Sequence, residues 1–235
     1  MAVIEAVDAL DFRLGGADWD YARGHADEIA AHWARRRVEQ PSLFNGRVLM
    51  LGRHAIEGRV LRGEFVEADF AAFLTWRESG FPAANACNGF AMAALRGADG
   101  AFLLGEMAAH TASAGSIYFP AGTPDRQDVF GDVVDLDASV RRELTEETGL
   151  DAGEAEIAPG WIVVRVRGHV ACMKPMRLSV TAEAARARID AWLDADPEAE
   201  FARMHVVRSE ADFSAAMPEF VRGFMAWVWE RERRA

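Results

Sequence analysis

Residues 141–150 read RRELTEETGL, a stretch in which five of the ten side chains are ionised. Positions three and four apart share one face of a helix, so Glu143, Glu146 and Glu147 are expected on the same side. Like charges at this spacing cost only about 0.3 kcal/mol per pair when they are solvated. The cluster is therefore either a solvated acidic face or a site for a hard divalent cation, which prefers carboxylate oxygens.

The residues around this stretch favour the cation. A helix is expected over residues 136–148, with Asp135 as its N-cap and Gly149 just beyond its last turn. Leu144 points to another side of this helix and can anchor it in the core. Upstream, SIYFPAG (116–122) is expected to be a strand that ends in a loop at Gly122. A carboxylate cluster on a rigid helix beside a glycine loop can hold a metal together with a phosphate of the substrate.

The run from Arg142 to Leu150 resembles the C-terminal half of the Nudix box. The pattern of that box is Gly, five residues, Glu, seven residues, then Arg-Glu-Φ-x-Glu-Glu-x-Gly-Φ, where Φ is aliphatic. All seven specified positions of the C-terminal half match. The Phe-Pro-x-Gly context identifies Gly122 as the box glycine, but Gly122 lies 20 positions before Arg142 where the family pattern has 14. Six extra residues therefore fall within 123–135.

The longer loop also departs from the family pattern in its acidic residue. The position eight before Arg142, usually Glu, is Val134 in this chain. Either that carboxylate is absent, or Asp132 or Asp135 takes its place, and the sequence leaves both alternatives open. The acidic residues of the loop are otherwise expected to be solvated, with a further cation as the alternative: Asp125, Asp128 and Asp132.

The resemblance implies an α/β protein, a Nudix-type α/β/α sandwich with a mixed sheet. It also implies a pyrophosphohydrolase that needs Mg²⁺ or Mn²⁺ and acts on a small nucleotide-type substrate, a nucleoside diphosphate linked to a sugar, a second nucleotide or coenzyme A. The alternative is a sensor with the same fold that binds a nucleotide without cleaving it. The intact glutamates favour the enzyme, and Val134 with the inserted loop favours the sensor.

The family's roles are carried over by motif position. Glu143, Glu146 and Glu147 would be metal ligands, and Glu143 would also polarise the attacking water. Arg142 would orient a carboxylate through its fork of donors, and Gly122 would shape the loop beside the site. A further acid from outside the box is expected just before the last strand, where Glu200 is the first choice and Glu198 the second. The alternative for both is a solvated turn. Three aromatic residues are expected in the core rather than as base-stacking platforms: Tyr118, Phe119 and Trp161.

The chain of 235 residues is long enough for one large domain with an accessory layer. We expect an accessory segment at residues 1–85, with helices over 18–39 and 67–79 and short strands between them. It would either cap the substrate pocket or form a homodimer interface. The Nudix domain would span 86–235, with a hairpin over 87–107, strands at 161–168, 176–184 and 201–209, and helices at 186–195 and 211–233.

Composition limits the classes of partner. A formal charge of −11 weighs against a duplex nucleic-acid binder, which needs a basic surface. No window approaches the roughly 18 apolar residues of a membrane span, so no membrane partner is expected. The first residues lack the order of a signal peptide, and the two cysteines have no CxxC spacing. We therefore expect a reduced, cytoplasmic protein.

Overall fold

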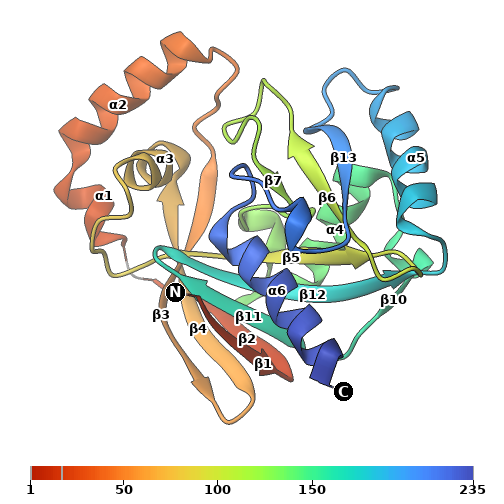
Figure 1. Cartoon of the computed structure of the whole chain (residues 1–235). Helices are drawn as coiled ribbons and strands as arrows, with labels where there is room; N and C mark the ends of the chain where they lie inside the picture. The colour runs from red at the N-terminus through yellow and green to blue at the C-terminus, as the bar shows by residue number, and fades with distance from the viewer. Residues whose placement is uncertain (1, 17, 235) are drawn as a thin grey trace.

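The computed structural model describes residues 2–16 and 18–234, and its largest element is a mixed sheet (Figure 1). In spatial order the strands are β1 (Val3–Val7), β11 (Trp161–Val166), β12 (His169–Leu178), β5 (Asn88–Arg96), β6 (Phe102–Met107) and β13 (Phe201–Val207). Two short strands join them, β10 (Ala155–Ile157) on β12 and β7 (Ile117–Tyr118) on β6. The β12 and β5 strands run parallel, whereas their neighbours are antiparallel.

Helices cover both faces of this sheet. Alternate side chains of β5 point to opposite faces, as the strand period requires. On one face Ala91 and Ala93 pack under α4 (Leu136–Thr148) and α5 (Ala182–Leu193). On the other, Phe90 and Met92 pack under α6 (Glu219–Arg234), which crosses the sheet in Figure 1. The predicted α/β class and the α/β/α sandwich are confirmed.

A second sheet combines N-terminal strands with the insertion in the box. Its order is β3 (Arg47–Glu57), β4 (Val60–Asp69), β2 (Ala9–Leu14), β9 (Val133–Val134) and β8 (Val129–Phe130). Three helices lie beside it, α1 (Asp20–Gly24), α2 (Ala26–Glu39) and α3 (Phe70–Glu78), and they share a core with β3 and β4. Three short 3₁₀ turns complete the described chain, at Arg126–Asp128, Ala152–Glu154 and Glu210–Asp212.

The two sheets exchange strands across the proposed domain boundary. The β1 strand comes from residues 1–85 but pairs with β11 of the large sheet. Conversely, β9 comes from the box insertion but pairs with β2 through Arg13 and Val133. The division at residue 85 therefore stays a proposal, and neither part has its full set of strands without the other.

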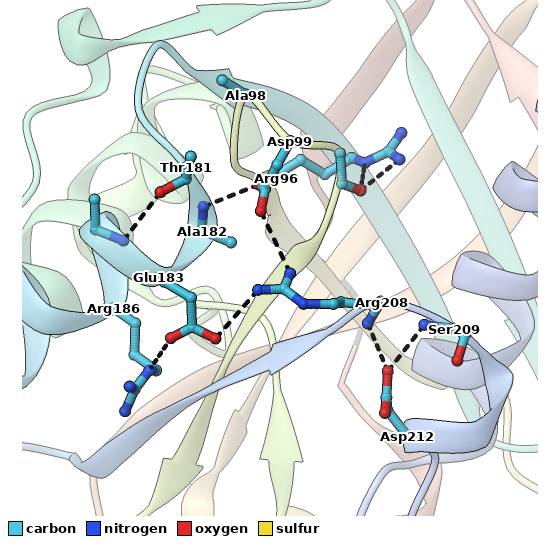
Figure 2. Close-up of polar contacts among 12 residues, drawn as sticks. Arg96, Ala98, Asp99, Thr181, Ala182, Glu183, Arg186, Arg208, Ser209 and Asp212 are labelled. Carbon is cyan, nitrogen blue, oxygen red and sulfur yellow. Dashed lines mark hydrogen bonds and ion pairs between the residues drawn. The ribbon is translucent and has the colours of Figure 1, made fainter.

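A polar network joins the β5–β6 hairpin to the start of α5 (Figure 2). The Asp99 carboxylate accepts a hydrogen bond of 3.0 Å from the backbone N–H of Ala182. Arg208, after β13, lies between Asp99 and Glu183 and contacts both, at 3.3 and 3.2 Å. Gly97 touches the same helix end, since a Cβ there would lie 2.2 Å from the Ala182 nitrogen. The hairpin thus supplies a partner for one of the free amides at the helix N-terminus.

The element boundaries differ from the predictions in two places. The predicted strand 176–184 is the end of β12, and α5 already begins at Ala182, where Thr181 supplies its N-cap. The predicted helix 211–233 begins only at Glu219. The Asp212 carboxylate accepts from the amides of Arg208 and Ser209, which holds the preceding residues in a turn. Within the described residues, the helices are all too short or too polar to cross a membrane.

Candidate active site

The loop that carries Gly122 is held between the two sheets. After β7, the carbonyl of Pro120 accepts a hydrogen bond of 2.9 Å from the amide of Ala93 in the large sheet. Four residues later, the carbonyl of Pro124 accepts one of 2.7 Å from the amide of Leu49 in the second sheet. Phe119 is fully buried, as predicted. Both ends of the loop are therefore fixed, and the backbone at Ala121 and Gly122 faces α4.

Glu147 points from α4 into this loop. Its side chain is 3% exposed, and its Oε2 accepts a hydrogen bond of 2.8 Å from the amide of Ala121. Burial raises the pKa of Glu147 well above its usual range, and the nearby Glu143 and Glu200 carboxylates raise it further, whereas the hydrogen bond from Ala121 lowers it. A buried carboxylate with one neutral donor and acidic neighbours is a group whose charge lacks compensation.

Glu143 lies one turn before Glu147 on α4 and contacts the glycine. A Cβ at Gly122 would lie 2.0 Å from Oε1 of Glu143, so only glycine leaves room for this carboxylate. Burial raises the pKa of Glu143 to about 7, Arg142 counteracts this, and Glu146 and Glu200 add to the rise. The predicted site glycine and the predicted catalytic glutamate are thus in direct contact despite their separation in sequence.

The third box glutamate is the most exposed of the three. The Glu146 side chain is 57% exposed and pairs with Nη1 of Arg142 at 2.8 Å, and the same nitrogen contacts Glu143 at 2.9 Å. Glu146 therefore lies near Glu143 but on the solvent side, and its role as a metal ligand stays a prediction. As the side chains stand, no group of three or more His, Cys, Asp or Glu residues in the described part of the chain is placed to hold a metal.

Asp128 is the acidic residue of the inserted loop that contacts Arg142. It is 2% exposed, and its Oδ1 accepts a hydrogen bond of 3.0 Å from Arg142. Neither of the two predicted substitutes does so. Asp132 is exposed and pairs with Arg13 at 3.3 Å, and Asp135 caps α4 through the amides of residues 137 and 138.

Sequence spacing hid this role because Val134 holds the expected position. Val134 is buried in the core and lies in β9, where the chain has turned away from Arg142. The expectation that the acidic residues of the loop are all solvated is also wrong for Asp128. Its Oδ2 accepts from the amide of Asp125, which closes a small capping turn. A short Asp-x-x-Asp turn was the one local signal.

The cavity beside the glycine loop has two adjoining lobes of about 590 Å³ each. We call the first the acidic lobe, because Glu143, Glu198 and Glu200 line it. Glu200 and Glu198 are both exposed and precede β13, so the structure brings the predicted outside acids to the same lobe as Glu143. Glu200 raises the pKa of Glu143 and of Glu147, which places its charge near both.

The second lobe lies against the apolar cluster of Phe90, Met92 and Phe220, and we call it the apolar lobe after these residues. Its other walls are polar and include Arg36, Gln40 and His169. Tyr118 lines both lobes, so its predicted place in the core is only partly correct, while Trp161 is buried. Two of the polar residues in these walls were not anticipated and bear on ligand binding: Arg77, on α3, and Asn88, at the start of β5. An asparagine opening an otherwise apolar strand was a signal for the second, whereas Arg77 looks like an ordinary helix end.

The donor set at the acidic lobe fits a divalent cation. Burial raises the pKa values of Glu143 and Glu147, and the other acidic side chains nearby raise them further. Hard ions such as Mg²⁺ bind through one or two carboxylates together with substrate phosphates and water. A complete protein cage is therefore not needed, and Glu143, Glu147 and Glu200 offer enough oxygens.

Comparison with known proteins gives only distant likenesses. No family model matches the sequence, and no curated protein matches it. Among solved structures, the chain is similar to a MutT protein from Methanosarcina mazei Go1, with 20% identity and a TM-score of 0.41, covering 63% of this chain and 95% of that one. It is also similar to RenU, a Nudix hydrolase from M. smegmatis, with 15% identity and a TM-score of 0.38, covering 62% and 82%. The second bears the name of the family that residues 142–150 resemble, but at this level of similarity the case for function rests on the site.

Proposed function

We propose that this protein is a hydrolase that cleaves the diphosphate bond of a nucleoside diphosphate derivative with the help of Mg²⁺ or Mn²⁺. The observation that carries the proposal is the placement of Glu143 and Glu147. Both leave α4 on the side of the glycine loop, where Glu147 is buried and Glu143 is half-buried and lines the acidic lobe. A solvated acidic face, the other explanation of the sequence, would leave them in water.

The residues divide the chemical tasks among them. Glu143, Glu147 and Glu200 would hold the cation. When bound, the cation would neutralise the diphosphate and make water a better nucleophile. Glu143 lines the acidic lobe and has a carboxylate oxygen to accept the proton of the attacking water. Arg142 contacts Glu143 and is itself held in place by Asp128 and Glu146. It would therefore fix the direction of that oxygen.

The test is cleavage across a panel of nucleoside diphosphate derivatives with Mg²⁺, with Mn²⁺ and with chelator. The variants are Glu147→Gln and, as a matched control, Glu156→Gln. Glu156 is exposed on β10 and does not line either lobe, so its replacement removes the same charge away from the site. We expect metal-dependent cleavage by the wild type and by Glu156→Gln, with a loss of at least about 100-fold in Glu147→Gln.

A second function has one observation in its favour. Arg142 pairs with two of the three box glutamates, which leaves fewer of their oxygens free for a cation. Tight binding of a nucleotide without any cleavage would identify a sensor and contradict the hydrolase. The cytoplasmic location, the homodimer and the absence of nucleic-acid and membrane partners stay predictions from the sequence.

A further inference from the structure

Arg77 lies at the junction between the two lobes and is bonded there to neutral groups. The guanidinium of Arg77 donates to the carbonyl of Ala112 at 3.0 Å and to the hydroxyl of Ser113 at 3.2 Å, both neutral groups. No ion pair is formed by Arg77 within residues 2–16 and 18–234. Burial lowers the pKa of Arg77, the neighbouring Glu78 counteracts this, and Arg36 lowers it slightly further. In a chain of net charge −11, an arginine enclosed among neutral hydrogen-bond partners is a local site of attraction for an anion.

The apolar lobe has an independent sign of a missing ligand. Asn88 is 8% exposed and lines this lobe, yet its buried Oδ1 has no hydrogen-bond partner. A buried acceptor without a donor costs about 1–3 kcal/mol, so such groups are rare in folded proteins unless they serve a ligand. Phe90 and Phe220 line the lobe with their rings 5.5 Å apart in an edge-to-face arrangement. The lobe can therefore receive a flat aromatic group that donates an N–H.

We propose that Arg77 binds a phosphate of the substrate at the junction and that Asn88 binds the nucleobase in the apolar lobe. This inference rests on the proposed function, because it extends the substrate from the acidic lobe. A diphosphate near Glu143 and Glu200 would reach Arg77, which lines both lobes, and the base would then lie in the adjoining lobe. The accessory residues 1–85 thereby supply a substrate-binding residue through α3, rather than only a cover.

The chemistry of the two contacts differs, so two variants give different results. Arg77→Gln removes a charge-assisted contact with phosphate, which is present in every diphosphate ligand. Asn88→Leu keeps the approximate shape of the side chain and removes the acceptor, which matters only for ligands that carry a base. The matched control for the first is Arg53→Gln, because Arg53 is exposed on β3 and lies outside both lobes.

The experiment is calorimetric titration of the full chain with Mg²⁺ and three ligands that cannot be cleaved at the diphosphate. They are the α,β-methylene analogues of ADP and GDP, and methylenediphosphonate, which has no base. We expect Arg77→Gln to weaken all three by about 10-fold or more. We expect Asn88→Leu to weaken at least one nucleotide analogue by about 10-fold and to leave methylenediphosphonate unchanged. Arg53→Gln should bind all three as the wild type does.

Several results would overturn the inference. The first is that Arg77→Gln binds every probe as tightly as the wild type does. The second is that Asn88→Leu weakens ligands with and without a base equally. The third is that the wild type binds none of the probes. Because Arg77 also holds residues 112 and 113, Arg77→Lys and a thermal unfolding curve accompany the titrations. Arg77→Lys keeps the charge but not the fork, and a loss of binding by Arg77→Gln that Lys partly restores indicates a contact with the ligand. The readout is binding and not cleavage, so a failure of the proposed hydrolysis and a failure of these two contacts give different results.

Discussion

Arg142 donates a hydrogen bond of 3.0 Å to Asp128, which lies in the box insertion and is almost fully buried. Removing one partner of a buried charge pair leaves the other charge uncompensated. We predict that Asp128→Asn lowers the free energy of unfolding by about 2 kcal/mol and lowers kcat/KM, because Arg142 loses its anchor beside Glu143. Chemical denaturation and steady-state kinetics measure both. Asp132→Asn, on the exposed Asp132, should change neither, and equal effects of the two variants would contradict the assignment.

We expect the replacement of Glu147 to change stability and activity in opposite directions. Glu147→Gln keeps an oxygen that accepts the hydrogen bond from Ala121, and it removes a buried charge. With chelator present, we therefore expect the free energy of unfolding of the variant to be about 1–3 kcal/mol higher than that of the wild type. Because the pKa of Glu147 is raised in the folded protein, the wild type loses stability as the pH rises above the unfolded pKa. The gain should therefore be largest at neutral pH and small near pH ~4, where the carboxyl is protonated in both states. Thermal unfolding with and without Mg²⁺ checks it, and a less stable variant would be the contrary result.

Gly122 gives a variant that separates folding from activity. A Cβ at Gly122 meets only the carboxylate end of Glu143, a side chain that can turn away, and the backbone conformation of Gly122 suits other residues. We predict that Gly122→Ala folds with nearly unchanged stability but loses at least about 10-fold in kcat, because Glu143 is displaced. Gly24→Ala is the control, since nothing lies within 4 Å of its added Cβ. Activity at the wild-type level in Gly122→Ala would show that the position of Glu143 is unimportant.

Asp99 lies far from the site, and we expect its carboxylate to make stability depend on pH. The hydrogen bond from Ala182 lowers the pKa of Asp99, so its contribution is present at neutral pH and is lost as the pH falls through the folded pKa, below about 4. We predict that Asp99→Ala costs about 1 kcal/mol at pH 7, in the range of helix-capping residues, and less in acid. Urea titrations at pH 7 and pH 3 measure the difference. A cost that is the same at both pH values would exclude the carboxylate as its cause.

The two cysteines should be poor nucleophiles in the folded state. Burial raises the pKa of Cys87 to about 12, and burial also raises that of Cys172, which is fully enclosed in the core. Since only the thiolate reacts, we expect alkylation by iodoacetamide at pH 8 to be slower than that of a free thiol by at least about 100-fold. Mass spectrometry of the native and the unfolded protein follows the reaction. Rapid labelling of native Cys172 would mean that the core opens readily.

Features that depend on neighbouring residues could be predicted from the sequence. Helix α4 spans the predicted residues, because its cap at Asp135 and its left-handed stop at Gly149 are local signals. The place of Gly122 in a loop beside the site was also expected, although through the family resemblance rather than through spacing, whereas its contact with Glu143 was not. Glu200 reached the acidic lobe as predicted, but its role as a ligand stays a prediction.

Features that depend on distant partners could not be predicted. Strands β1 and β2 were not anticipated, since β1 pairs with residues 161–165 and β2 with residues 60–65. The role of Asp128 depends on how the insertion folds back on Arg142, which no local pattern records. Arg77 reaches the cavity beside residues 112 and 113 of the loop between β6 and β7, which are far from it in sequence, so its position at a helix end carries no hint of this role.

The inserted residues 123–135 leave the site and return to it, since Gly122 before them contacts Glu143 after them. Their hairpin is taken up by the second sheet, and Arg126 fastens it there to Glu67 at 2.6 Å. Gly122 and Glu143 meet across it as neighbours. The distance along the chain between the halves of such a motif is therefore free to vary, while the meeting of its two ends is not. The contact between the backbone turn and the glutamate therefore defines this motif better than the number of residues between them does.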